Sequence, residues 1–107
     1  NNGELNGIRL LSRTTIKVIM ANQIGDLFPK NPESFYGLAF RVQTNQGEGA
    51  GGNGSIGTFS WGGYFNTSYF ADPEEQIIGI LLKQTQKITS DDTGWQFPIL
   101  VGQSLDN

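Results

Sequence analysis

A four-residue turn signal between two apolar segments constrains the fold of this chain more than any other feature. Residues 72–75 are Asp-Pro-Glu-Glu, and Asp followed by Pro is typical of a type I turn. The turn predicts that residues 67–71 form a strand that pairs antiparallel with the apolar residues 76–82. Because residues 76–82 show no alternation of apolar and polar side chains, we expect this strand in the centre of a sheet with both faces covered.

Further strands are predicted before this turn. Residues 36–43 alternate between large apolar side chains and small or polar ones, the pattern of a half-buried strand. Residues 58–61 form another short candidate. The glycine-rich loop that joins them contains G-x-G-x-x-G at Gly47, Gly49 and Gly52. A dinucleotide site needs this motif between a strand and a helix, so we favour a hairpin connection without a nucleotide.

One helix is expected near each end of the chain. Ser12 is suited to cap a helix over residues 13–22, because its hydroxyl can accept from the free N–H groups of the first turn. Residues 97–105 carry apolar side chains at helical spacing, with Pro98 in the first turn. Together these elements predict an α+β fold in a single unit, with an antiparallel sheet of three to four strands flanked by an N-terminal and a C-terminal helix.

The residue types that are missing exclude several kinds of site. The chain has no His and no Cys, so it holds no Ser-His-Asp triad, no thiol nucleophile and no zinc site of the usual ligands. Its net charge of −3 argues against nucleic acid as a partner. No apolar segment approaches the roughly 20 residues that span a membrane. The carboxylates of Asp72, Glu74 and Glu75 fit a solvated turn better than a metal site, and we expect no cofactor.

Residues 54–82 carry a more specific signal than any single motif. They contain GSIGTFSWGG, an aromatic strand, the Asp-Pro turn and QIIGILL, in that order. This order resembles the C-terminal part of the β-lactamase-like serine hydrolases, the superfamily of class C β-lactamases, penicillin-binding DD-peptidases and family VIII esterases. Residues 3–12 and 97–105 extend the resemblance over nearly the whole chain. It implies that residues 1–107 are a partial domain, the C-terminal portion of a β-lactamase/transpeptidase-like α/β fold.

The same resemblance implies where a substrate would bind. Members of the superfamily combine a Ser-x-x-Lys nucleophile, a Tyr-x-Asn-like loop and a strand motif that is Trp-Gly-Gly in some esterase-like branches. Trp61, Gly62 and Gly63 match the strand motif and are implied to contact substrate, since a side chain at the glycines would hold it off the strand edge. The backbone N–H of Tyr64 is implied to donate into the oxyanion hole. The implied substrate is a small ester, amide or lactam.

Two elements of the family pattern are missing from the chain. No serine is followed by Lys three residues later, and Tyr64-Phe65-Asn66 lies in the turn of the strand motif itself, so it cannot be the second element. Trp61 takes the place of a cation that would hold a substrate carboxylate, which shifts the implied substrates toward neutral esters. We therefore expect the hydrolase activity to belong to a longer parent protein and this chain alone to be inactive.

The alternative is a non-catalytic binding or structural domain of the same fold. Its contact surface would be the aromatic side chains of Trp61, Tyr64, Phe65 and Tyr69, which are expected to be exposed. In either case the sheet would be cut from the rest of its domain, so we expect the isolated chain to self-associate through a bare strand edge. Proteins of this superfamily are commonly periplasmic or secreted, and the resemblance implies the same location.

Overall fold

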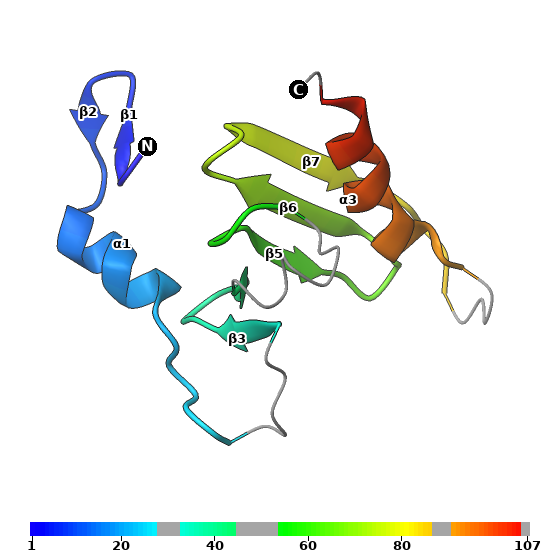
Figure 1. Cartoon of the computed structure of the whole chain (residues 1–107), viewed down its shortest axis with the longest axis horizontal. Helices are drawn as coiled ribbons and strands as arrows, with labels where there is room; N and C mark the ends of the chain where they lie inside the picture. Colours follow the sequence, from blue (N-terminus) through cyan, green and yellow to red (C-terminus); the bar gives the residue numbers. More distant parts are fainter. Residues whose placement is uncertain (28–32, 45–53, 87–90, 106–107) are drawn as a thin grey trace.

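The computed structural model describes residues 1–27, 33–44, 54–86 and 91–105. A short hairpin is followed by a helix, five strands and a second helix (Figure 1). The elements in chain order are β1 (Glu4–Leu5), β2 (Ile8–Arg9), α1 (Arg13–Met20), β3 (Ser34–Tyr36), β4 (Arg41–Gln43), β5 (Phe59–Gly62), β6 (Ser68–Asp72), β7 (Ile77–Leu81) and α3 (Thr93–Ser104). The G-x-G-x-x-G motif lies outside the described residues, so its role stays a prediction.

Strands β3 to β7 form one antiparallel sheet in which each strand pairs with its neighbours in the sequence. The predicted α+β fold is therefore confirmed, with a helix near each end of the chain and an antiparallel sheet between them (Figure 1). The sheet has five strands, whereas the sequence predicted three to four. The small hairpin β1–β2 is separate from this sheet. Its turn, Asn6-Gly7, has both φ angles positive, at 50° and 79°, as a type I′ turn requires.

The prediction of one strand over residues 36–43 is wrong, and this accounts for the extra strand. The segment splits into the end of β3 and all of β4, joined by a turn in which the Gly37 N–H donates to the Phe40 carbonyl at 2.9 Å. The next N–H, from Leu38, donates to the carbonyl of Ile19 at 2.9 Å. A Cβ at Gly37 would overlap that Ile19 oxygen, so glycine lets the turn approach the end of α1.

Strand β7 lies at the edge of the sheet, which contradicts the central position predicted for it. Its only strand neighbour in the described chain is β6. Ile78 is 73% exposed and Ile80 is 61% exposed. Gly79 between them is buried, and its side-chain position lies on the opposite face, against the ring of Phe70. Exposed and buried positions therefore alternate along β7, as in a strand with one covered face. The described residues cover one face of this strand and leave the other face open.

The buried apolar side chains of the described chain lie on both faces of the sheet. Phe70 is on the face that α3 covers, whereas Val42 and Ala71 are on the opposite face, because both lie in register with Phe59. The Phe70 ring meets the ring of Phe97 from α3 edge to face, with centroids 5.9 Å apart. A Cβ at Gly79 would overlap the Phe70 ring. The absence of a side chain at Gly79 therefore leaves the space that this ring occupies next to α3.

Both predicted helices are present, but their first or last residues differ from the predicted ones. Ser12 caps α1 as predicted, because its hydroxyl accepts from the Thr15 N–H at 3.0 Å, but the helix ends at Met20 and not at residue 22. Helix α3 begins at Thr93, four residues before the predicted start at 97, and contains Pro98 in its interior. Its first N–H, from Thr93, donates to the Asp91 carboxylate at 3.3 Å, which starts the helix earlier than the apolar pattern indicates.

The predicted turn at residues 72–75 connects β6 to β7. Asp72 is buried, at 2% exposure, and its carboxylate accepts from the backbone N–H groups of Ser55 at 2.7 Å, Glu74 at 3.0 Å and Glu75 at 3.1 Å. Burial alone would raise the pKa of Asp72. The hydrogen bonds from the Ser55 and Glu75 backbones outweigh burial and hold this pKa below its ordinary value.

Candidate functional site

The second half of β5 has a strand partner on one side only. Pairing between β4 and β5 covers Phe59 and Ser60 and stops there, whereas pairing between β5 and β6 continues to Gly62. Trp61 and Gly62 therefore have β6 on one side and no described strand on the other. We name residues 61–64, at this open side, the strand-edge site.

Backbone polarity at the strand-edge site follows from one hydrogen bond. The Gly63 N–H donates to the Thr67 carbonyl at 2.9 Å, toward β6. Because backbone groups of successive residues in a strand point to opposite sides, the N–H and carbonyl of Gly62 face the open side. Tyr64 lies in the turn that follows, and its N–H donates to no group in the described part of the chain.

A tight turn closes the strand-edge site and leads into β6. The Asn66 N–H donates to the Gly63 carbonyl at 3.1 Å, and Asn66 has a left-handed φ of 62°, which Asn tolerates better than most residues. The turn is tied to the segment after β7, because the Thr85 N–H donates to the Phe65 carbonyl at 3.2 Å. Gln86 adds a side-chain hydrogen bond to the Tyr64 hydroxyl.

A cluster of four polar side chains holds this turn in place: Asn66, Lys83, Thr85 and Asp91. The Asn66 amide donates to the Thr85 hydroxyl at 3.1 Å and to the Asp91 carboxylate at 3.3 Å. Asp91 also forms an ion pair with Lys83, and the two side chains are only 11% and 16% exposed. Hydrogen bonds from Lys83 and then Thr93 hold the pKa of Asp91 well below its usual range. The Lys83 ammonium is thus occupied by Asp91 rather than directed at a substrate.

The two glycines of the strand-edge site differ in their surroundings. Both line a hollow of about 280 Å³ that Lys83 and Asp91 also border. A Cβ at Gly63 would overlap the Thr67 hydroxyl, whereas a Cβ at Gly62 would meet only the Thr67 carbonyl oxygen, at 3.5 Å. Local packing therefore explains glycine at 63. It does not explain glycine at 62, whose backbone faces the open edge.

The aromatic surface expected for a binding domain forms only in part. Trp61 is 48% exposed, Tyr64 74% and Phe65 46%, and the Trp61 ring meets Tyr36 edge to face at a centroid distance of 5.7 Å. Tyr69, in contrast, is half-buried and lies against Phe40, with centroids 6.4 Å apart. Tyr69 is therefore not one of the exposed aromatic residues.

The cluster of Asn66, Lys83, Thr85 and Asp91 was missed as a unit by sequence reasoning. Asp91 lies at the start of α3, where its carboxylate accepts from the Thr93 N–H. No local pattern shows that the same carboxylate reaches a turn 25 residues earlier. The described residues contain no group of three metal-ligating side chains close enough together to hold an ion.

Comparison with known proteins does not assign the chain to a family. Neither a scan against protein-family models nor a search of curated proteins found a match. Of the helices that the structure describes, none has the length and apolar character needed to cross a membrane. The geometry of the strand-edge site is therefore the main basis for inferring function.

Proposed function

We propose that this chain is the C-terminal part of a serine hydrolase similar to the β-lactamase-like family, and that the strand-edge site is one wall of its active site. The observation that carries the proposal is the open side of β5. There Gly62 directs its backbone groups away from β6, and no residue in the described ranges accepts the Tyr64 N–H. An acyl group can lie along such an edge and pair with backbone groups as an added strand does.

In the proposed reaction, a serine from the upstream part of the parent protein attacks the carbonyl carbon of an ester, amide or lactam. The carbonyl oxygen becomes an oxyanion and accepts hydrogen bonds from the backbone N–H groups of Tyr64 and of that serine. The lysine of the upstream Ser-x-x-Lys takes the serine proton and passes it to the departing group, and water then hydrolyses the acyl-enzyme to release the acid and restore the serine. Trp61 stands where the family carries a cation and Lys83 is paired with Asp91, which favours neutral esters over substrates that need a carboxylate contact.

The activity of the isolated chain tests the proposal at low cost. We expect the 107-residue chain to show no turnover of a chromogenic ester or a chromogenic cephalosporin, because it holds no Ser-x-x-Lys. The same assay on the parent protein, expressed with its upstream coding sequence, should show ester turnover. Turnover by the isolated chain above a heat-denatured control would mean that its chemistry comes from other residues.

A second candidate function is a binding domain without catalysis. The exposed side chains of Trp61, Tyr64 and Phe65 support it, since aromatic residues dominate protein contacts. The upstream sequence separates the two candidates: a Ser-x-x-Lys favours the hydrolase, and its absence favours the binding domain.

Self-association of the isolated chain is expected through β7. The alternation along β7 directs the backbone groups of Ile78 and Ile80 to the outer edge, and the two side chains are exposed. Edge strands are usually protected from pairing by a charged residue or a proline. Ile77–Leu81 contains neither. Light scattering should therefore give a mass above 11.7 kDa, and Ile80→Lys should restore the monomer. A wild-type monomer at micromolar concentration would contradict this expectation.

A further inference from the structure

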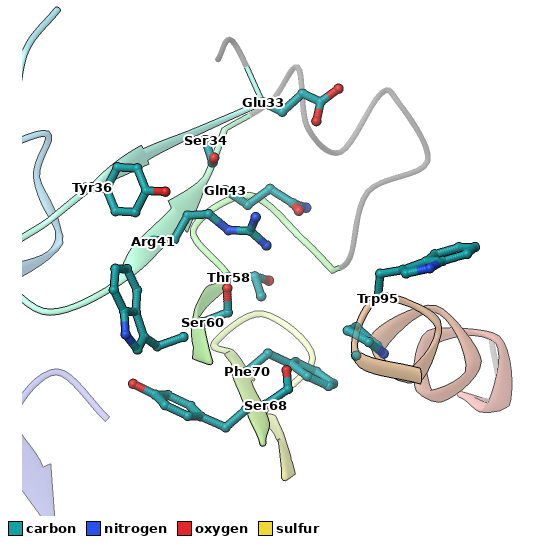
Figure 2. A pocket seen from close by; sticks show the side chains of 14 residues that line it. Glu33, Ser34, Tyr36, Arg41, Gln43, Thr58, Ser60, Ser68, Phe70 and Trp95 are labelled. Carbon is teal, nitrogen blue, oxygen red and sulfur yellow. The ribbon is translucent and has the colours of Figure 1, made fainter. Parts of the chain in front are cut away.

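A second and larger hollow lies on the sheet face that carries α3. Its volume is about 400 Å³, within the usual range for sites that hold small molecules. The β3–β4 hairpin forms one wall, the first turns of α3 form the other, and β5 and β6 form the floor (Figure 2). Helix α3 packs against β6 and β7, and no described helix or strand covers the part of the same face that β3 and β4 form.

The strand register places the polar side chains of this hollow in one row. Tyr36 lies opposite Arg41 in the sheet, Arg41 lies opposite Ser60, and Ser60 lies opposite Phe70. Residues directly opposite one another project from the same face, so the Arg41 guanidinium lies between a phenol ring and a serine hydroxyl (Figure 2). A row with arginine and serine at its centre is unsuited to pack against an apolar helix, because burying them without partners is costly. The occupant is therefore polar.

The charge in the hollow indicates what kind of polar group fits. The side chain of Arg41 makes no hydrogen bond or ion pair with any residue in the described ranges, and Arg41 is exposed. Among the described residues that line the hollow, Arg41 is the only basic one, and Glu33 lies at the rim. One guanidinium opposed by a nearby carboxylate suits a singly charged anion better than a phosphate dianion. Arginine binds a carboxylate through two parallel N–H···O bonds.

Aromatic rings on opposite sides of the hollow favour a ligand with a flat ring. Trp95, in the first turn of α3, lines the hollow and is 56% exposed, with its ring directed away from Arg41 in Figure 2, and Tyr36 flanks Arg41 on the other side. We propose that this hollow binds a small aromatic carboxylate, with its carboxylate on Arg41 and its ring among the aromatic side chains that line the hollow. The proposal does not rest on the hydrolase function, because Arg41 lies outside the strand-edge site and Trp61 is the one residue of that site that also lines the hollow.

Tryptophan fluorescence of the intact chain tests the proposal, because both tryptophans, Trp61 and Trp95, line the hollow. Phenylacetate should change the emission with a saturable, millimolar dissociation constant. Acetate lacks the ring and 2-phenylethanol lacks the charge, so both should bind at least about tenfold more weakly, as expected for loss of a charged hydrogen-bond pair or a buried ring.

The variants separate this site from general effects of charge. Arg41→Gln should weaken phenylacetate binding by about tenfold or more. Arg13→Gln, a matched change at an exposed arginine on α1, should leave binding unchanged. Equal binding of phenylacetate and 2-phenylethanol, a response that never saturates, or unchanged affinity in a folded Arg41→Gln variant would each overturn the proposal.

Discussion

Replacing Asp72 with alanine should lower the free energy of unfolding by about 3 kcal/mol, because hydrogen bonds to a charged acceptor each contribute about 1.5–3 kcal/mol and some of the freed donors regain water. The carboxylate of Asp72 is the acceptor for the N–H groups of Ser55, Glu74 and Glu75. It thereby joins the β6–β7 turn to the segment before β5. A loss of this size is a large share of the stability of a small domain, and urea denaturation followed by circular dichroism measures it.

The matched control is Glu74→Ala, which removes a carboxylate from the same turn. Glu74 is exposed, and the contact that it makes with Asp72 uses its backbone N–H, which alanine retains. We expect this control to change the free energy of unfolding by less than about 0.5 kcal/mol. Equal effects of the two substitutions would mean that Asp72 does not anchor the turn.

The stabilisation by Asp72 should also depend on pH in a defined direction. Because folding lowers the pKa of this carboxyl, ionised Asp72 stabilises the fold above its unfolded pKa of about 4, and the contribution is lost as pH falls through the lower folded pKa. Asp91 shifts in the same direction. The difference in stability between the wild type and Asp72→Ala therefore isolates Asp72, and it should shrink below about pH 4. A difference that grows on acidification would contradict the assignment.

In the parent protein, Gly62→Val should reduce kcat/KM for an ester by about 100-fold, similar to the loss of one oxyanion-hole donor. A valine at this position would hold an acyl group away from the open edge and from the Tyr64 N–H. The fold should tolerate the change, since a Cβ at Gly62 has space and valine is favoured in strands. Steady-state ester hydrolysis, with a thermal melt of each variant, measures both quantities.

Gly102→Ala is the matched control for this prediction. Gly102 lies in α3, and a Cβ there meets no neighbouring atom, so activity should be retained. Gly63→Val is a poorer test because its Cβ would overlap the Thr67 hydroxyl, and a loss of activity would then report packing. An unchanged rate in a folded Gly62→Val variant would contradict the placement of substrate along β5.

Features that depend on neighbouring residues in the sequence were predicted well. The Asp72 turn and the Ser12 cap are each made by a side chain and backbone groups within three residues of it. The Trp61-Gly62-Gly63 motif was likewise placed on a strand followed by a turn, and β5 and the turn closed by Asn66 match that expectation.

Features that depend on distant contacts were not predicted. Residues 36–43 alternate in polarity as one strand would, but the contact between Leu38 and the carbonyl of Ile19 makes the chain turn there. The apolar sequence of β7 suggests burial, and its position follows only from the order of all five strands. The link from Asn66 to Asp91 spans 25 residues, and neither residue indicates the other by its local pattern.

The central claim is that the strand-edge site completes the active site of a serine hydrolase. Its most direct test is the mass of the parent protein after reaction with a fluorophosphonate, a reagent that attaches covalently to activated serines. The proposal predicts one adduct, located by peptide mapping on the serine of an upstream Ser-x-x-Lys and formed more slowly in Gly62→Val than in Gly102→Ala. A folded parent protein that has no Ser-x-x-Lys, or that carries one and remains unlabelled, would contradict the claim.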